Sequence, residues 1–402
     1  MSGRGDTPSV VYVLPDKIGG VVSYVENLLA WRRPDAFRHH AVLTHNRRES
    51  DTRFGGALSA DATRQVEFAL PPENLHAVLR RLRRAVGDGP GVLVANDWIE
   101  LAMAAAYDTG RTVVSIVHGD WDYYYDLAAK HDEVIHAHVT YSRKIHARML
   151  ELLPAARERI FHLPYGVAVP ARARAIDAAG RAPLRLLFVG RMTREKGIFD
   201  LPEIDRHLRD AGVEATWTVQ GSGPEAAALQ SVWHDEGRIV YRGVQPIEAV
   251  LAQYLDHDLL VFPCRSEGLP VALLEAMAAG VVPVVSDLES GVRDVVDTGV
   301  NGWRVAVGDT AGFARAVLAA GGDRAALAAM GGAARRTVVE RYDVRATVAG
   351  YQELYGRWRE LYRPRPRRTT LHYGSRLDRA WIPNGVTRAL RAWRRQAWGR
   401  TR

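Results

Sequence analysis

Residues 261–280 read VFPCRSEGLPVALLEAMAAG, and this stretch decides the fold. An apolar run beginning at Val261 gives way to a loop of small and charged residues, and then to a helical pattern rich in Ala and Leu. Pro270 suits the first turn of that helix, because its missing N–H costs nothing there. A strand, a loop and a helix in this order form the repeating unit of α/β sheets.

The same stretch carries two carboxylates. Glu267 lies in the loop, and Glu275 follows eight positions later in the predicted helix. On one straight helix they would be about 12 Å apart along the axis, so the turn at Gly268, Leu269 and Pro270 has to bend the chain for both to face one pocket. That turn also leaves N–H groups at a helix N-terminus, which suits oxyanions or sugar hydroxyls.

The strand–helix alternation extends outward over most of the chain and restarts once. Buried strands are predicted at residues 10–14, 41–44, 92–95, 113–117 and 139–141, and again at 184–189, 216–220, 239–241, 259–262 and 282–286. Runs of β-branched residues without strict alternation are typical of strands buried on both faces, as in a parallel sheet. The pattern predicts an α/β protein with two Rossmann-like, doubly wound domains.

The composition shifts mark the domain boundaries. The predicted parts are an N-terminal domain over 1–170, a polar linker over 171–182, a second domain over 183–342, a helix over 343–362 that returns towards the N-terminal domain, and a basic tail over 363–402. Asp343 is a suitable N-cap for the returning helix, whose pattern covers 344–361. Prolines 364 and 366 end that helix.

The composition also indicates in which cellular compartment the protein is expected. Hydrophobic residues make up 47% of the 402 residues and charged residues 25%, which is globular. The single Cys264 excludes a disulfide within the chain and fits a reducing compartment. The apolar run before Pro15 is too short for a signal peptide, and no apolar stretch is long enough to span a bilayer. We expect a cytoplasmic protein, with a peripheral position on the inner face of the membrane as an alternative; the Arg- and Ala-rich usage hints at a bacterial source.

The net charge of +8 is concentrated in the tail. Residues 363–402 carry twelve Arg and one acid, a local net of +11, so the other 362 residues sum to 8 − 11 = −3. An apolar stripe at helical spacing is formed by Val386, Ala389, Leu390, Trp393 and Ala397. Such a basic amphipathic helix suits an anionic membrane surface, or it packs on the protein's own N-terminal domain. Nucleic acid is not expected, because no recognition motif accompanies the charge.

A second group of candidate residues follows the strand over 184–189. The segment LRLLFVGRMTREKG ends its apolar run at Gly190 and then carries Arg191 and Lys196. Two cations at the carboxyl end of a parallel strand suit a diphosphate. The segment is not a P-loop, because Glu195 occupies the position where that motif needs a glycine.

The first strand is followed by a glycine pair, Gly19 and Gly20, in the segment VVYVLPDKIGGVVSYVENLL over residues 10–29. The dinucleotide motif G-x-G-x-x-G is absent from this turn. A glycine pair lets the backbone approach a bound phosphate or acceptor closely.

Taken in order, these segments form a recognisable set. It comprises the glycine pair at 19–20, His118 in SIVHGD, LPYGV at 163–167, VGRMTREKG at 189–197, QGSGPE at 220–225, RGV at 242–244, the Glu267–Glu275 pair and DVVDTGVNGWRV at 294–305. The chain resembles the retaining glycosyltransferases of family 4. That resemblance implies the GT-B fold, with two Rossmann-like domains facing across a cleft: an N-terminal acceptor-binding domain over 1–170 and a C-terminal donor-binding domain over 183–342.

The resemblance also implies roles for the second-domain residues. Arg191 and Lys196 would hold the donor diphosphate and stabilise the charge on the leaving nucleotide, and Glu275 would accept hydrogen bonds from the ribose. Glu267 and the backbone at 268–270 would hold the donor sugar.

For the remaining residues, the resemblance implies that His118 lies near the reacting sugar and that Gly19 and Gly20 approach the phosphates or the acceptor. Gly190 belongs to the donor site, and Gly243 and Val244 would flank the base.

The implied activity is transfer of a sugar from a nucleotide-diphospho-sugar to a glycan, lipid-linked or small-molecule acceptor, with retention of anomeric configuration, as in polysaccharide biosynthesis. No tightly bound cofactor or metal is expected.

Residues 289–291 (Glu-Ser-Gly) depart from the glycine pair usual in the family, which leaves the donor sugar open, and Cys264 and Arg265 replace small polar residues. A metal site among His131, Asp132, Glu133, His136 and His138 matches no compact zinc spacing. The alternatives are another GT-B enzyme, such as a nucleotide-sugar epimerase or a phosphorylase, and a non-catalytic nucleotide-sugar or glycan-binding module.

Overall fold

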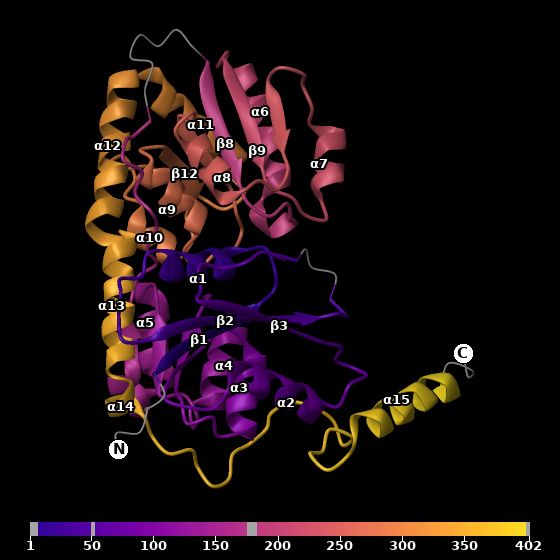
Figure 1. Ribbon diagram of the computed structural model, residues 1–402. Helices are drawn as coiled ribbons and strands as arrows, with labels where there is room; N and C mark the ends of the chain where they lie inside the picture. The colour runs from indigo at the N-terminus through magenta and orange to yellow at the C-terminus, as the bar shows by residue number, and fades with distance from the viewer. Residues whose placement is uncertain (1–6, 50–52, 175–182, 399–402) are drawn as a thin grey trace. The chain divides into compact units, whose positions relative to one another are not determined.

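The computed structural model describes residues 7–49, 53–174 and 183–398 (Figure 1). The chain forms two compact units. Unit 1 consists of Met1–Tyr141, Ile145–Leu163 and Val348–Arg402, and unit 2 of Ser142–Lys144 and Pro164–Thr347. The chain therefore leaves unit 1, builds unit 2 and returns to unit 1.

Unit 1 is built on a parallel sheet in the order β3-β2-β1-β4-β5-β6-β7. Its strands are β1 (Ser9–Pro15), β2 (Arg38–Asn46), β3 (Ala62–Phe68), β4 (Gly91–Ala95), β5 (Thr112–Val117), β6 (Ala137–Thr140) and β7 (Ile160–His162). In the central register, Val11 of β1 pairs with His40 of β2 and with Leu93 of β4. All side chains of β4 and β5 are buried, as expected for central strands covered on both faces.

Helices cover both faces of this sheet. They are α1 (Gly20–Ala30), α2 (Leu75–Val86), α3 (Trp98–Ala106), α4 (Asp122–His131) and α5 (Arg143–Leu152), with a 3-10 turn at Pro154–Arg159. Figure 1 shows α1 on one side of β1–β3 and α2, α3 and α4 on the other. The apolar face of α2 contributes Val78, Leu79 and Leu82 to the core beneath the sheet. Helices on both faces of a parallel sheet are the arrangement that alternating strands and helices favour.

Unit 2 repeats the arrangement with a six-stranded parallel sheet in the order β10-β9-β8-β11-β12-β13. Its strands are β8 (Leu184–Val189), β9 (Ala215–Gln220), β10 (Ile239–Arg242), β11 (Leu259–Phe262), β12 (Val282–Ser286) and β13 (Trp303–Val305). Its helices are α6 (Leu201–Asp210), α7 (Ala226–Val232), α8 (Ile247–Tyr254), α9 (Val271–Ala278), α10 (Gly291–Val295), α11 (Thr310–Gly322) and α12 (Arg324–Arg341). Helix α6 packs on α11, and α9 packs on α12.

The returning segment differs from its prediction as a single helix over 344–361. It forms α13 (Val344–Gly356) and α14 (Trp358–Leu361), separated at Arg357. Gly356 is the residue at the break, and glycine weakens a helix interior by its backbone entropy. From α13, Tyr351 packs edge-to-face on Tyr24 and Tyr355 on Tyr12, which places both rings in the core of unit 1. Asp343 accepts a hydrogen bond from the backbone N–H of Arg345 at 2.7 Å, as a cap does.

The α/β fold class with two Rossmann-like parallel sheets is thus confirmed, and both strand orders follow the 3-2-1-4-5-6 pattern of doubly wound sheets. Of the predicted linker over 171–182, residues 175–182 lie outside the described part of the chain. Over the described residues, we find no helix that combines the length and the apolar character needed to cross a bilayer.

Candidate active site

The candidate residues of unit 2 gather where the strand order of its sheet reverses. Strand β8 is flanked by β9 on one side and by β11 on the other, so the crossovers leave in opposite directions. The loops after β8 and β11 therefore meet at the carboxyl edge of the sheet, which is where doubly wound sheets bind ligands. Arg191 and Lys196 lie in the first loop and Glu267 in the second.

Lys196 and Glu267 form an ion pair across these two loops. Their side chains are only 17% and 15% exposed, so the pair lies largely out of water. Burial lowers the pKa of Lys196, and the Arg191 charge acts in the same direction, whereas the contact with Glu267 favours the ammonium form. The ammonium group also lies 5.7 Å from the centre of the Phe262 ring. A cation held in this way can exchange its carboxylate partner for a bound diphosphate.

Backbone contacts fix the two loops to each other. The N–H of Arg265 donates to the carbonyl of Glu195 at 2.7 Å, and the Arg265 guanidinium pairs with Asp200 at 2.9 Å. Gly197 has φ 66°, and a Cβ there would collide with the Pro263 carbonyl. The unusual Arg265 of the sequence is therefore a structural tie between the β8 and β11 loops.

The QGSGPE segment packs against the loop after β8. The N–H of Gly190 donates to the carbonyl of Gln220 at 3.0 Å, and the N–H of Met192 donates to the carbonyl of Ser222 at 2.8 Å. Arg191 lies between these two anchored residues and is itself exposed. Its backbone is therefore fixed while its guanidinium stays available to an anion.

Glu275 lies in α9 and is buried, with 9% of its surface exposed. The Tyr254 hydroxyl, contributed by α8, donates a hydrogen bond to its carboxylate at 3.0 Å. Burial raises the pKa of Glu275 to about 7, although the Tyr254 hydrogen bond opposes the shift. The carboxyl group is thus poised to change charge near neutral pH.

If Glu275 accepts hydrogen bonds from ribose, donor affinity depends on its ionisation. We expect binding of a nucleotide-diphospho-sugar, whose diphosphate diester does not titrate near 7, to strengthen as pH rises through about 7 and to weaken below it. Tyr254→Phe removes the hydrogen bond that lowers the pKa, so its midpoint should lie at higher pH. Glu275→Gln should bind weakly with a flat profile. Calorimetric titrations between pH 5.5 and 8.5 measure how the donor affinity depends on pH. If the affinity of Glu275→Gln depended on pH as strongly as that of wild type, the titrating group would be another residue.

The residues expected to hold the sugar and the base are ordered by hydrogen bonds to backbone groups. The N–H of Gly291 donates to the carbonyl of Gly268 at 2.7 Å, so the Glu-Ser-Gly segment lies against the turn at 268–270. Pro270 is the N-cap of α9, one residue before the first-turn position predicted for it. Gln220 donates from its side-chain amide to the carbonyl of Gly243 at 2.5 Å.

Leu269 is buried, whereas Val244 is 52% exposed after β10. An exposed apolar side chain on a fixed loop suits contact with a flat base.

Unit 1 has its own reversal point, between β1 and β4. Gly19 is the N-cap of α1 and Gly20 its first residue; both are exposed, and a Cβ at either would meet no atom within 4 Å. Packing within the protein therefore does not require glycine at these positions. The open space is consistent with close approach of a ligand to the backbone.

His118 directly follows β5, next to the reversal point. Its Nε2 lies 2.7 Å from the side-chain oxygen of Asn96, which follows β4. Because an amide oxygen only accepts, Nε2 carries the proton. Burial lowers the pKa of His118 to about 3, so the imidazole is neutral at physiological pH. It can donate or accept a hydrogen bond there without changing charge.

Three polar residues after β4, of which Asn96 contacts His118, were not singled out in the sequence. Asn96 also donates to the carbonyl of Val13 at 2.7 Å, which fixes its orientation. Glu100 is fully buried and accepts from the N–H groups of Asn96 and Asp97 at 2.7 and 2.6 Å, while Asp97 caps α3. The spacing of Asp97 and Glu100 after a buried strand is typical of a capping box, and this pattern in the sequence could have identified both residues.

An aromatic surface continues from His118. Trp121 and Tyr123 are 43% and 49% exposed, and both contact Tyr124, with ring centres 5.9 and 5.1 Å apart. Tyr124 lies 6.3 Å from the His118 ring. Gly119 leaves room for the Trp121 indole, which a Cβ would strike. We name Trp121, Tyr123 and Tyr124 the aromatic platform.

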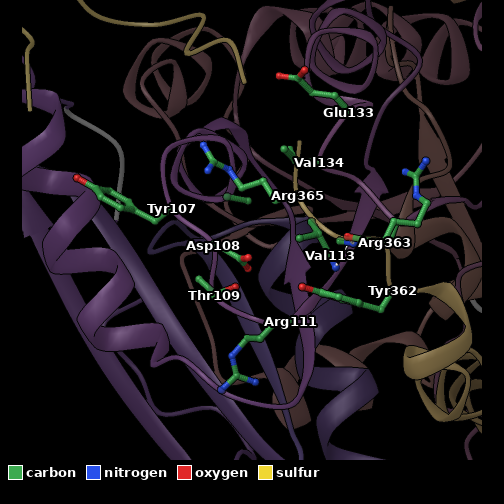
Figure 2. A pocket seen from close by; sticks show the side chains of 12 residues that line it. Tyr107, Asp108, Thr109, Arg111, Val113, Glu133, Val134, Tyr362, Arg363 and Arg365 are labelled. Atoms are coloured by element: carbon green, nitrogen blue, oxygen red, sulfur yellow. Dashed lines mark hydrogen bonds between the residues drawn. The ribbon is translucent and has the colours of Figure 1, made fainter. Parts of the chain in front are cut away.

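A separate hollow lies at the opposite, amino end of the same strands (Figure 2). Three arginines line it, and each is bonded to backbone carbonyls: Arg111 to Gly87 at 2.9 Å, Arg363 to Ile135 at 2.7 Å, and Arg365 to Ala105. Arg363 and Arg365 thereby hold the chain after α14 against unit 1.

The histidines near this hollow have structural partners. His138 bonds to Asp132 at 2.9 Å, and His136 accepts from the N–H of Val113 at 2.9 Å. In the described part of the chain, no three His, Cys, Asp or Glu side chains gather in a way that could hold a metal ion.

Comparison with known proteins places this geometry in context. Residues 183–323 match the family model described as glycosyl transferases group 1. The chain is similar to a putative colanic acid biosynthesis glycosyltransferase, WcaL, of Escherichia coli, at 31% identity over 43% of this chain and 45% of that protein. It is also similar to a 2-deoxystreptamine glucosyltransferase of Streptomyces kanamyceticus, at 30% identity over 43% of this chain and 46% of that protein. The alignments thus span less than half the length of these relatives.

Solved structures agree on the fold. Anabaena HepE, crystallised with UDP-glucose, superposes with a TM-score of 0.70 at 15% identity, covering 87% of this chain and 99% of that one. A sucrose-phosphate synthase from Thermosynechococcus elongatus gives a TM-score of 0.69 at 17% identity, covering 87% and 98%. The chain therefore has the GT-B fold, and its residues 183–323 match the glycosyl transferases group 1 family model.

Proposed function

We propose that this protein is a retaining glycosyltransferase that moves a sugar from a nucleotide-diphospho-sugar to a carbohydrate-containing acceptor. The observation that carries the proposal is the partly buried Lys196–Glu267 pair at the reversal point of unit 2, with Arg191 exposed beside it. Two cations there would neutralise a diphosphate. Positive charge placed beside a leaving group stabilises the negative charge that develops on it in the transition state. The relatives named above are glycosyltransferases, which supports the same activity.

In the proposed reaction, the bond between the anomeric carbon and the diphosphate oxygen breaks while the acceptor oxygen bonds to that carbon from the same face. The acceptor proton passes to the departing phosphate oxygen, so no redox partner is needed. Lys196 and Arg191 stabilise the charge that develops on the diphosphate, and Glu275 holds the ribose. Retention follows from the resemblance to family 4. The anomeric proton coupling of the product, measured by NMR, tests it.

A donor screen separates this proposal from its alternatives. A nucleotide-sugar present at 100 times its dissociation constant should stabilise its binding unit by about 2.7 kcal/mol, or roughly 5–11 °C in melting temperature. Binding with no sugar transferred to any acceptor would favour the binding module. Conversion of the donor without an acceptor would indicate an epimerase, and absorbance from a lysine Schiff base would indicate a phosphorylase.

The aromatic platform supports a sugar in the acceptor. The C–H face of a pyranose ring packs well on aromatic rings, and Trp and Tyr combine such a face with a polar edge. Trp121 and Tyr123 offer this surface next to His118. The glycan and lipid-linked glycan acceptors fit this platform better than an acceptor without a sugar.

We expect Trp121→Ala to raise the KM for a sugar acceptor about threefold to tenfold and to leave donor affinity unchanged, because one stacking contact is lost. The assay uses a panel of p-nitrophenyl glycosides as soluble acceptors. Trp381→Ala, at an 80% exposed tryptophan outside the platform, is the matched control. An equal KM in Trp121→Ala and wild type would remove the platform from the acceptor site.

A further inference from the structure

The chain after α14 is attached to unit 1 through buried polar groups. The side-chain amide of Asn74, which is fully buried, donates to the carbonyl of Leu377 at 3.1 Å and to the hydroxyl of Thr387 at 3.0 Å. Asp378 accepts from the N–H of Leu75 at 2.7 Å and pairs with Arg391 at 2.5 Å. Four buried or partly buried polar groups therefore fix the amino half of α15 (Asn384–Trp398) in place.

This attachment uses only one face of α15. Thr387 and Arg391, four residues apart, face unit 1, and Thr387 is fully buried. A different face carries Val386, Leu390 and Trp393, which are 47%, 41% and 66% exposed. The contacts with unit 1 therefore leave the apolar stripe of the helix uncovered. The side chains of Arg395, Ala397 and Trp398 lie outside the described part of the chain.

The charge around the stripe has one sign. Asp378, the last acid in the sequence, is already paired with Arg391, and seven arginines but no acid follow it. Arg388 and Arg394 are exposed on other faces of the helix. Trp381, just before the helix, is 80% exposed. Exposed tryptophan and arginine around an apolar stripe are typical of helices that lie in the headgroup region of a membrane.

Charge also distinguishes between the partners that could cover this face of α15. A second copy of α15 would bring two arginine-rich faces together, which like charges oppose. A nucleic acid would pair with the arginines but leave Trp393 and Leu390 in water. An anionic lipid surface suits both the arginines and the apolar stripe, because its phosphates attract arginine and its acyl boundary accepts apolar side chains.

We propose that α15 docks this protein on an anionic lipid surface: the face with Val386, Leu390 and Trp393 inserts at the acyl boundary, and the exposed arginines on the other faces of the helix are attracted to the lipid phosphates. The polar attachment at Asn74 and Asp378 holds the helix on unit 1, so the proposed acceptor-binding unit is brought to the membrane. This docking goes beyond the proposed transfer reaction and does not depend on it.

Co-sedimentation with vesicles of equal parts phosphatidylcholine and phosphatidylglycerol tests the docking, with no donor or acceptor present. The full chain should sediment with these vesicles and stay in the supernatant with pure phosphatidylcholine. Leu390→Glu should weaken the partition by roughly tenfold or more. Arg388→Gln together with Arg394→Gln should weaken it about 30-fold, at about fivefold per arginine, and high salt should do the same.

Val339→Glu, at a 45% exposed valine on α12, is the matched control and should bind as wild type does. Circular dichroism checks that every variant is folded. Failure of the wild type to sediment, or equal partition of Leu390→Glu, would overturn the proposal. So would a dimer in sedimentation velocity that Leu390→Glu disperses, because a second copy would then occupy the face. Sugar transfer to a soluble acceptor should be the same in Leu390→Glu and wild type, so loss of docking and loss of transferase activity are distinguishable.

Discussion

Lys196→Ala is expected to lower kcat for sugar transfer by roughly 10²–10³-fold, the cost of removing one preorganised charge or hydrogen-bond donor from a transition state. The ammonium lies at the reversal point of unit 2, largely out of water, where its charge acts over a short range with little screening. The donor diphosphate gains negative charge as its bond to the sugar breaks. The loss should therefore fall mainly on kcat and less on the donor KM.

Lys130→Ala provides the matched control. Lys130 is an exposed lysine in α4 that pairs with Asp126 at 2.9 Å, and its removal should leave kcat unchanged. Because Lys196→Ala leaves Glu267 without its cationic partner, a thermal melt must accompany the kinetics. A folded Lys196→Ala protein with wild-type kcat would contradict the role proposed for this residue.

Asp258→Asn is expected to destabilise unit 2 by about 3–5 kcal/mol, because it leaves a buried arginine without its counter-ion. Asp258 is 2% exposed and pairs with Arg174 at 2.6 Å and with Arg185 at 3.0 Å, and Arg324 lies 3.7 Å away. Arg174 is itself only 1% exposed. For a unit of this size the loss corresponds to roughly 6–20 °C in melting temperature.

Differential scanning calorimetry is the suitable measurement, because the transition that shifts between wild type and Asp258→Asn is the one of unit 2. Asp256→Asn, two residues earlier and exposed, should melt within about 1 °C of wild type. A melting temperature for Asp258→Asn equal to that of wild type would show that the cluster contributes nothing.

The same carboxylate makes stability depend on pH. Burial alone would raise the pKa of Asp258, but hydrogen bonds from Arg185 and the charges of Arg185 and Arg174 outweigh it and lower the pKa below the ordinary value near 3.8. The contribution is therefore present above about pH 4 and is lost as pH falls through the lowered pKa. The melting temperatures of wild type and Asp258→Asn should converge in acid.

Most of the fold could be predicted from the sequence, because its central strands are buried on both faces. Strands β8 and β12 have the predicted bounds, since uninterrupted apolar runs leave no ambiguity. Strand β3 was missed because it lies at the edge of its sheet and carries Arg64, Gln65 and Glu67 exposed to water. Strand β13, of three residues, is too short to give a periodic signal.

The candidate site could be predicted only in part. Lys196 and Glu267 were identified from their positions in loops after predicted strands, and the resemblance implied their roles; the structure adds their direct contact. The Asn96–His118 contact joins residues from two strands that neighbour in space, a relation that no local pattern encodes. Tyr254, which bonds Glu275 from α8, was missed for the same reason. The cleft predicted between the two domains stays a prediction.

The split of unit 1 along the chain has a consequence for biosynthesis. Tyr351 and Tyr355, which pack against Tyr24 and Tyr12, are translated only after the whole of residues 164–347. At 5–20 residues per second this delay is on the order of 10–40 s. Throughout that time the emerging unit 1 lacks two core rings and exposes the apolar surface that they cover. Unit 2 is contiguous and can fold while unit 1 waits, so chaperone engagement during translation should concentrate on the amino-terminal half of the nascent chain.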